Sequence, residues 1–361
     1  MWQNTHLKKL IVKKKKLWRD VRRSKNNGIA HSILVDRYKH LNKLVKSLCR
    51  TGLKLYEHKI ASNCKDNPKV VHKYINDKIK VKHNIRAISD ANNELITDPK
   101  KICDTFNDWF YTVFKKEECE NMPDCPPPTR LCDFLIWDPI NIGDRLAKVK
   151  INKSAGPDGV HPYVLKQCAL SLSFPICLLG KKSVELGVVP VQWKFANITP
   201  VFKSGSKLIP TNYRGISLTS VLCKFIERII ADHIMAYLLR FNLISRHQHG
   251  FISKLSTVTN LLQYIDIISG ALDKKYSVDV IYLDFAKAFD RVPHSRMVLK
   301  LKSIGITGSL LVWCESFLSN RKQRVVMGEH IGEWKDILSG VPQGSVLGPL
   351  FFLIYLNDLL E

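Results

Sequence analysis

Residues 281–290 read IYLDFAKAFD, a stretch in which an apolar run is followed by two acids six positions apart. The apolar run 280–283 predicts a buried strand that would deliver Asp284 at its end. A carboxylate there costs free energy unless a cation or hydrogen bonds neutralise it. Asp284 could cap the following turn, or it could hold Mg²⁺ against phosphate groups. The nearby aromatic Phe289 favours the second interpretation, and Asp290 is expected to fix the turn into the next helix.

The chain is strongly basic. Its 361 residues contain 56 Lys and Arg against 32 Asp and Glu, a formal net charge of +24, in an otherwise ordinary globular composition. Such an excess suggests a polyanionic partner, most commonly nucleic acid, although a basic but inert surface is the alternative. Residues 1–60 hold 17 Lys and Arg and 3 Asp and Glu, so 17 − 3 = +14 of the total lies at the front.

The basic front has a helical pattern. Apolar residues recur there at alternating spacings of four and three, which predicts one or two amphipathic helices. Gly52 interrupts this stripe and Leu55 resumes it, while its earlier members are Leu34, Tyr38, Leu41, Val45 and Leu48. The outer face would be strongly basic, and it would either bind phosphate groups or simply be solvated.

Cysteine usage and hydropathy indicate where the chain works. The ten cysteines are scattered, with none in a Cys-x-x-Cys pair, so a structural zinc site is not expected. The N-terminus carries the lysine run 13–16 in place of a secretion signal, and no stretch is apolar enough to cross a membrane. We therefore expect an intracellular protein with reduced thiols, nuclear or cytoplasmic, not secreted and without a membrane partner.

Turn and periodicity signals divide the chain into three regions. We expect a basic helical region over 1–117, a proline-rich loop and connector over 118–144, and a mixed domain over 145–361. The mixed domain alternates helices with short strands, which predicts the α+β class. Its expected elements are a turn at 154–159, a hairpin around 198–207, helices at 221–239, 257–272, 295–305 and 310–318, strands at 323–328 and 332–340, and a glycine-rich turn feeding a last helix at 349–360. The helix at 295–305 would have Ser295 as N-cap and Gly305 as its stop.

Four further positions carry groups suited to phosphates or nucleotides. Lys203 lies at the predicted hairpin and Arg214 in a loop that follows it, and such cations clamp phosphates. Gln343 and Gly344 lie in the turn ahead of the last helix, where glycine lets the backbone approach a ligand closely. Each signal alone is weak, because a hairpin lysine is usually solvated and a glycine-rich turn is usually only a turn.

Together and in this order, the motifs resemble the reverse transcriptase of non-long-terminal-repeat retrotransposons, the long interspersed element type. The resemblance covers residues 145–361 and rests on NKSAGPDGV, WKFANITPVFKSGSK, NYRGISL, QHGFISKLST, YLDFAKAFDRVPH and SGVPQGSVLGPLFFLIYLNDL. It implies the fingers and partial palm of a right-hand polymerase, preceded by a basic helical region, that copies RNA into DNA. The partners it implies are an RNA template, a DNA primer and deoxynucleoside triphosphates.

The resemblance also assigns roles to residues of this chain. It implies that Asp284 is catalytic and binds both Mg²⁺ ions of a two-metal site, together with the backbone carbonyl of Phe285. The nucleotide-binding residues that it implies are Lys203 and Arg214 on the triphosphate, Phe289 near the sugar, where it excludes a 2′-hydroxyl, and Gln343 and Gly344 on the incoming nucleotide.

The chain departs from the family pattern in three places, one of which is Lys254 or its neighbours in QHGFISKLST, where the family usually has arginine. Gly215 follows the arginine of NYRGISL, where the family usually has proline. The Asp-Asp motif that supplies the partner carboxylates does not occur before Glu361, and Asp358 belongs to the apolar pattern of the last helix. We therefore expect a polymerase fragment that is inactive alone and exposes part of its last helix, or alternatively a non-catalytic RNA-binding remnant. His247 and His249 are expected to be structural.

Overall fold

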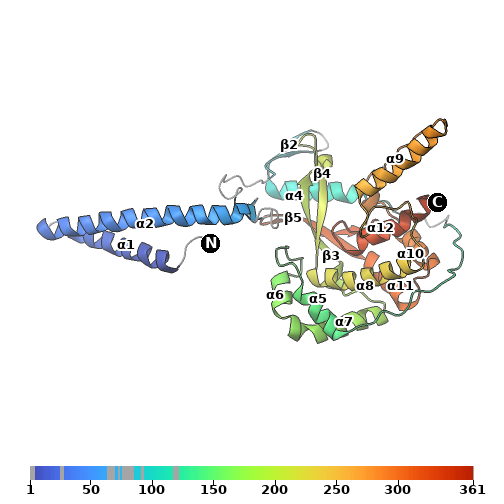
Figure 1. The fold of residues 1–361 in the computed structure, drawn as a ribbon, viewed down its shortest axis with the longest axis horizontal. Helices are drawn as coiled ribbons and strands as arrows, with labels where there is room; N and C mark the ends of the chain where they lie inside the picture. The colour runs from blue at the N-terminus through green and yellow to red at the C-terminus, as the bar shows by residue number, and fades with distance from the viewer. Residues whose placement is uncertain are drawn as a thin grey trace. The chain divides into compact units, whose positions relative to one another are not determined.

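The chain forms two compact units, residues 1–84 and 85–361. The computed structural model describes residues 5–24, 28–62, 70–71, 74, 85–90, 93–116 and 122–360 (Figure 1). The described part of the first unit is helical, whereas the second unit mixes helices with short strands. The predicted α+β class is therefore confirmed.

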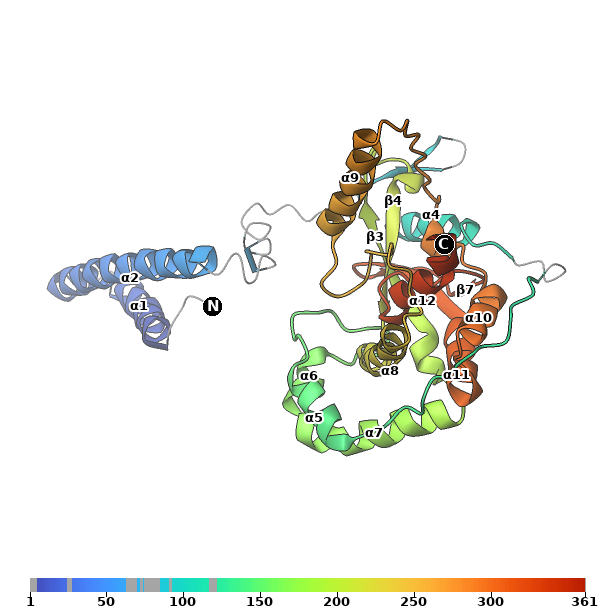
Figure 2. The same ribbon diagram turned by 45° about the vertical axis from the view of Figure 1, so that its right-hand side comes forward.

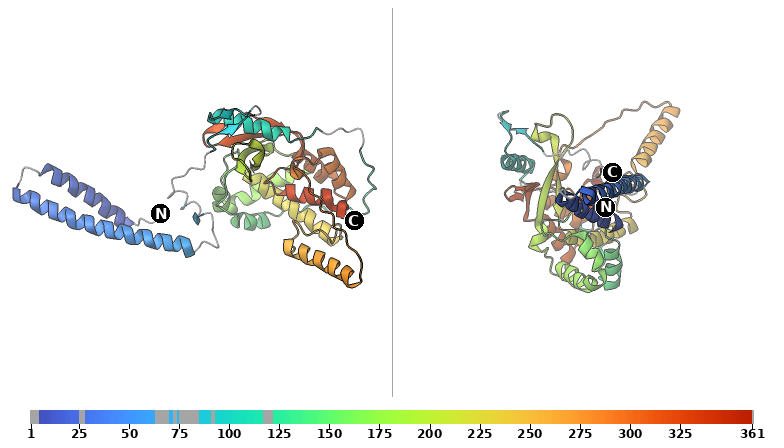
Figure 3. Two further views of the ribbon diagram at one scale, coloured as in Figure 1. Left: turned by 90° about the horizontal axis from the view of Figure 1, so that it is seen from above. Right: turned by 90° about the vertical axis from the view of Figure 1, so that its left-hand side faces the viewer.

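In the first unit, helices α1 (Thr5–Arg23) and α2 (Gly28–Ser62) pack side by side as a hairpin (Figure 3). Val21 and Val45 are buried, and the rings of Trp18 and Tyr38 lie 4.8 Å apart. Part of the apolar surface of each helix is thus covered by the other helix, while most basic side chains of α1 are exposed.

The apolar stripe of α2 continues differently from the prediction. The helix runs through Gly52 without a break, and Leu55 is 68% exposed. Tyr56 and Ile60 continue the less exposed face instead, because a period of 3.6 residues aligns 52, 56 and 60. Gly52 therefore belongs to the packed face.

The second unit is built on a five-stranded sheet in the order β4-β3-β5-β6, with β7 also pairing on β5. Its strands are β3 (Phe195–Phe202), β4 (Tyr213–Thr219), β5 (Arg321–Met327), β6 (His330–Ile331) and β7 (Lys335–Ile337). The predicted hairpin is confirmed, since β3 and β4 pair antiparallel from Ala196 with Thr219 to Phe202 with Tyr213. Arg214 consequently lies in a strand and not in the predicted loop. A separate two-stranded ladder joins β1 (Ile88–Ser89) to β2 (Leu95–Ile96).

Helix α4 (Pro99–Thr112) packs against the sheet (Figure 2). Asp98 caps its N-terminus by accepting a hydrogen bond from the Lys101 amide at 2.8 Å. Phe106 is fully buried, and its ring lies 4.9 Å from that of Tyr213 in β4. The division between units falls between residues 84 and 85, earlier than the boundary predicted at 118, because the aromatic face of α4 is used by the sheet.

The remaining helices share a large hydrophobic core with Trp313, Phe317 and Phe351 at its centre. They are α5 (Pro139–Ala147), α6 (Pro162–Gln167), α7 (Ala169–Glu185), α8 (Val221–Arg240), α10 (His294–Ser303), α11 (Gly308–Leu318) and α12 (Leu347–Leu356). Short 3₁₀ turns occur at Val191–Lys194, Pro210–Asn212, Ala288–Asp290 and Asn357–Leu360. Across the described ranges, none of the helices combines the length and apolar character of a membrane span.

Two predicted helix details need correction. Helix α10 begins at His294 with Pro293 at the N-cap, so Ser295 is already inside the helix. Gly305, with φ +97°, follows its end as predicted. Helix α12 contains no exposed residue, because α8 and α10 pack on it. Within the last helix predicted over 349–360, Leu359 lies beyond the end of α12 and is 57% exposed, so the expected apolar exposure is found at that end and not on α12.

Many exposed apolar side chains lie on α9 (Thr257–Asp273) and on the segment 276–285. Helix α9 projects from the rest of its unit (Figure 1), and none of its residues is buried. Ile281, Tyr282 and Leu283 are 83%, 80% and 75% exposed, and no described strand pairs with this segment. The predicted buried strand ending at Asp284 is therefore not formed, because a strand needs a neighbour to satisfy its backbone groups.

Candidate functional site

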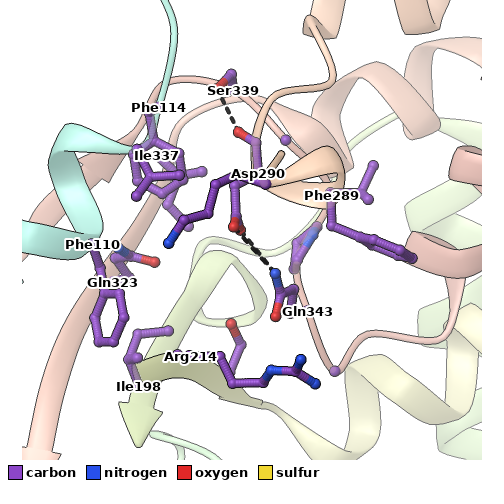
Figure 4. A pocket seen from close by; sticks show the side chains of 18 of the residues that line it. Phe110, Phe114, Ile198, Arg214, Phe289, Asp290, Gln323, Ile337, Ser339 and Gln343 are labelled. Carbon is purple, nitrogen blue, oxygen red and sulfur yellow. Dashed lines mark hydrogen bonds between the residues drawn. The ribbon is translucent and has the colours of Figure 1, made fainter. Parts of the chain in front are cut away.

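A cavity of about 510 Å³ lies where the β3–β4 hairpin meets two turns, residues 287–290 and 339–344. The residues that the sequence proposed for nucleotide binding all line it, namely Lys203, Arg214, Phe289, Gln343 and Gly344. Figure 4 shows Asp290 and Gln343 pointing toward each other, with Arg214 on the neighbouring strand. The structure thus brings together residues from separate parts of the sequence, while their individual roles stay predictions.

The turn 339–344 is held on two sides by backbone hydrogen bonds. The Val341 amide donates to the Phe289 carbonyl at 2.8 Å, which joins this turn to the turn 287–290. The Ser217 amide of β4 donates to the Gln343 carbonyl at 2.9 Å. The side chain of Gln343 therefore starts from a backbone position that is fixed on both sides.

Two glycines make this close packing possible. Gly340 has φ +86°, and a Cβ there would lie 2.6 Å from the Phe289 carbonyl oxygen. Gly344 has φ +112°, and a Cβ there would lie 2.6 Å from the Ser217 carbonyl oxygen. Both combine a conformation that favours glycine with a contact no side chain could fit. The sequence suggested that Gly344 admits a ligand, whereas its close neighbour in the structure is strand β4.

The cavity gathers positive charge. Lys203 and Arg214 are exposed at its rim, and Lys287 is half-buried. Burial lowers the pKa of Lys287; Asp290 opposes this effect, whereas Lys203 and Arg291 reinforce it. Cations that lie close enough to lower the pKa of Lys287 favour the binding of an anion.

Asp290 is the acid of this cavity. Nε2 of Gln343 donates to both of its carboxylate oxygens, at 3.2 Å each, and its backbone carbonyl accepts from the Ser339 hydroxyl at 2.8 Å. Burial raises the pKa of the Asp290 carboxyl, against the opposing effects of Lys287, the Gln343 hydrogen bond and Arg291. Asp290 therefore joins the turn 287–290 to the turn 339–344. The sequence predicted only that it would fix its own turn into the next helix.

Phe289 lines the cavity but faces away from its polar centre. Its ring stacks on Phe352 of α12, with centroids 4.5 Å apart and planes inclined by 22°. Figure 4 shows the ring turned away from Asp290 and Gln343. Contact between Phe289 and a sugar therefore stays a prediction.

Asp284 lies outside this cavity. Together with Phe285 it lines a neighbouring cavity of about 930 Å³, and both cavities share Ala288. Asp358 lines the second cavity as well, and its carboxylate forms an ion pair with Lys300 Nζ at 2.5 Å. The exposed carboxylate of Asp284 is thus separated from the other predicted site residues by a single turn.

The described residues do not form a complete two-metal magnesium site by themselves. Within the described ranges, no three His, Cys, Asp or Glu side chains are placed to hold a metal ion. Mg²⁺ requires near-octahedral coordination by oxygen and leaves its water shell reluctantly. Asp284 and the Phe285 carbonyl could supply part of such a site, but they do not form a two-metal site by themselves.

Sequence reasoning missed part of the cavity. Lys287 was not singled out, and Asp290 was considered only for its turn, yet both line the site. The available signal was their place inside the aromatic motif FAKAFD, because a charge flanked by apolar residues is often partly buried and needs a partner.

His247 and His249 are held by helix α9. Nδ1 of His249 lies 2.9 Å from the Thr259 hydroxyl, and its Nε2 lies 2.6 Å from Oε1 of Gln263. Nε2 of Gln263 lies 3.3 Å from Nδ1 of His247. These bonds are in keeping with the structural role expected for both histidines.

Residues 201–361 match the family model described as reverse transcriptase (RNA-dependent DNA polymerase). A probable RNA-directed DNA polymerase from transposon X-element of Drosophila melanogaster is 31% identical over 224 residues, which is 62% of this chain and 25% of that protein. The RNA-directed DNA polymerase from mobile element jockey of the same species is 29% identical over 217 residues, 59% of this chain and 23% of that protein. A Pol polyprotein from type-1 retrotransposable element R2 of Popillia japonica is 30% identical over 177 residues, 48% of this chain and 24% of that protein.

Residues 201–361 therefore belong to the reverse transcriptase family. Within it, the chain is related to the polymerases of non-long-terminal-repeat retrotransposons, as its motifs predicted. The chain spans about a quarter of the length of the curated relatives that it matches.

Proposed function

We propose that this chain provides the fingers and part of the palm of an RNA-directed DNA polymerase. In this proposal the cavity between the β3–β4 hairpin and the two turns binds the incoming deoxynucleoside triphosphate. The observation that carries it is the convergence of Lys203, Arg214 and Lys287 on one cavity that also contains Gln343. Cations clamp phosphate groups, and an amide can select among sugar and base groups by hydrogen bonding.

The residues take distinct roles in this proposal. Lys203 and Arg214 are exposed at the rim, where they can reach a mobile triphosphate, and Lys287 adds charge from inside. Phe289 limits the space beside the sugar from its place between the cavity and α12. An RNA template and a DNA primer would be the macromolecular partners of the whole polymerase.

Nucleotide binding, rather than polymerisation, is the activity proposed for this chain alone. The described residues do not form a magnesium site, and a two-metal polymerase needs several anionic ligands. Asp284 and the Phe285 carbonyl are proposed as part of the ligand set of the whole polymerase. We expect no primer extension on a homopolymer RNA template, and extension that is lost in Asp284→Ala would contradict this expectation.

Calorimetric titration of the full chain with deoxyadenosine triphosphate tests the proposed cavity. Lys203→Ala and Arg214→Ala should each weaken binding about ten- to a hundredfold, since a hydrogen bond to a charged group is worth roughly 1.5–3 kcal/mol. Lys150→Ala is the matched control, because Lys150 is an exposed lysine that does not line the cavity. Equal affinities for the two cavity variants and the control would refute the assignment.

A second candidate function, binding of RNA backbone, is favoured by the helical hairpin of the first unit. Its outer surface is rich in exposed cations: on α1 these are Lys8, Lys9, Lys13, Lys15, Lys16, Arg19, Arg22 and Arg23. A surface of this kind binds phosphates with little sequence preference and with strong dependence on salt.

The salt dependence of RNA binding tests this second function. The slope of log affinity against log salt should fall by about 0.7 for each single-strand phosphate contact that is lost. The test variant replaces three exposed lysines of α1 by glutamine, and its matched control replaces three exposed lysines of the second unit: Lys9, Lys13 and Lys16 against Lys148, Lys150 and Lys153. An equal slope in the two triple variants would favour the solvated face.

A further inference from the structure

The direction of the Gln343 amide decides what a ligand meets in the cavity. One end of the amide carries two N–H donors and the other a carbonyl acceptor. The backbone of Gln343 is fixed through the Ser217 amide on one side and through the neighbouring Val341 amide on the other. The Gln343 side chain can therefore change direction only by rotation about its own bonds, and the hydrogen-bond partner of its amide controls this rotation.

That partner is the carboxylate of Asp290. An ionised carboxylate can only accept hydrogen bonds, so it selects the N–H end of the amide. Both of its oxygens lie 3.2 Å from Nε2 of Gln343, which directs Oε1 of Gln343 away from Asp290. The position of Asp290 is itself fixed, because its backbone carbonyl accepts from the Ser339 hydroxyl, which accepts from the Lys115 amide at 2.9 Å.

We propose that Asp290 is a positioning residue for the nucleotide. Its carboxylate holds Gln343 so that the amide carbonyl oxygen accepts a hydrogen bond from a hydroxyl or N–H group of the bound nucleotide. The inference deepens the nucleotide-binding function proposed above and rests on it. It adds a residue that does not touch the ligand and acts on it only through Gln343.

The surroundings of the Asp290 carboxylate favour the role of a positioning residue over a purely structural role. The carboxylate is half-buried, its hydrogen-bond partner is a neutral amide, and burial raises its pKa. Ionised groups that are desolvated in this way are costly for the fold and concentrate at functional sites. An asparagine would keep the shape without the cost of burying a charge.

A charge-matched pair of variants tests the proposal by titration of the full chain with deoxyadenosine triphosphate. Asp290→Asn and Asp290→Ala both remove the negative charge, but only asparagine retains an acceptor for Gln343. The asparagine variant should bind the nucleotide about three- to tenfold more tightly than the alanine variant, the value of one hydrogen bond. Inorganic tripolyphosphate, which has neither sugar nor base, should bind both variants equally.

The same pair in a Gln343→Met background shows whether Asp290 acts through Gln343. There the two variants should bind the nucleotide equally, because methionine has no amide to orient. A difference that persists in this background, or equal binding with Gln343 present, overturns the proposal. If the wild-type chain binds no deoxyadenosine triphosphate, the proposed function fails and this inference fails with it.

Thermal unfolding of each variant accompanies the titrations. Should Asp290→Ala not fold, Asp290→Leu replaces it, because leucine has nearly the shape of asparagine and no acceptor. A melting temperature shared by the asparagine and leucine variants, with different nucleotide affinities, supports positioning. Affinities that only follow the melting temperatures overturn it.

Discussion

The turn 339–344 and the segment 276–285 both adjoin the FAKAFD motif (residues 285–290), the first through hydrogen bonds and the second along the chain, yet their environments differ completely. In the turn 339–344, Val341 is 2% exposed and its amide donates to the Phe289 carbonyl at 2.8 Å. In the segment 276–285, Ile281 is 83% exposed and no described strand pairs with its backbone. The apolar residues Val341 and Ile281 therefore differ in burial together with the backbone hydrogen bonds of their segments.

The same contrast separates the two predicted parts of the site. The residues proposed to bind nucleotide line the cavity beside the hydrogen-bonded turn 339–344, where Gly340 and Gly344 allow close backbone contact. This part of the molecule is called the clamped side. Asp284, the residue proposed to bind metal, lies on the exposed side. The clamped side is expected to keep its geometry in this chain alone, whereas the metal-binding side depends on residues that the described part does not provide.

The largest expected effect is at Glu227, which fixes the start of α12 directly after the turn 339–344. Its buried carboxylate accepts from the amides of Val346 and Leu347, at 2.6 and 3.1 Å, at the start of α12. Glu227→Ala should destabilise the chain by about 3–5 kcal/mol, because it leaves these amides unpaired and removes a buried charge that acts on Arg321. Denaturant unfolding measures the effect.

Glu227→Gln is the control for this change, since it retains one acceptor oxygen at the start of α12. It should lose clearly less stability than alanine. Equal losses would mean that Glu227 serves α12 by filling space and not by hydrogen bonding.

A pair of glycine variants compares the turn 339–344 with helix α9 by the effect of one added methyl group. Gly340→Ala should cost about 2–4 kcal/mol, because the added Cβ meets the Phe289 carbonyl oxygen in a backbone conformation that disfavours alanine. Gly270→Ala in α9 meets nothing within 4 Å and should stabilise the helix by roughly 0.5–1 kcal/mol. Unfolding free energies of the two variants should therefore change in opposite directions, and a loss of stability in Gly270→Ala would show that α9 is covered in solution.

A smaller effect is expected in the exposed segment. Ile281→Thr should change the unfolding free energy by less than about 0.5 kcal/mol, as for most surface positions. Amides of 277–283 should exchange with solvent far faster than those of β4 in a hydrogen-exchange experiment, because β4 is paired with β3 along its length. Strong protection of this segment would indicate that it pairs with a strand, in this chain or in a second copy.

The smallest expected effect is the pH dependence that Asp290 gives to the clamped side. Burial raises the pKa of its carboxyl in the folded chain, against Lys287 and Arg291. The folded state then binds more protons than the unfolded state between the ordinary pKa of aspartic acid and the raised one. Stability from this group should therefore fall as pH rises through that window. Asp290→Asn should flatten the slope of unfolding free energy against pH there, and an unchanged slope would contradict the assigned burial.

Local sequence signals predicted most elements of the second unit. Helix α8 follows the N-cap Ser220, whose hydroxyl accepts from the Cys223 amide at 3.2 Å, and the β3–β4 hairpin closes around a Ser-Gly turn. Such signals act within a few residues, so they are visible in one sequence. The buried strand predicted over 280–283 is wrong because β-branched and aromatic residues only favour a strand, and the strand forms only when another strand is present beside it.

The sequence by itself determined the family, because the residues of the motifs and their order along the chain are those of the family. The same motifs also supplied the residues of the proposed nucleotide site. The tertiary structure alone decided that Lys203, Arg214 and Gln343 share one cavity, that Asp290 holds Gln343, and that Asp284 stands apart on an exposed segment. The physical reason is that motifs specify side chains and local turns. Hydrogen bonds between distant segments, such as Ser217 to Gln343 and Val341 to Phe289, depend on close approaches that no local pattern encodes.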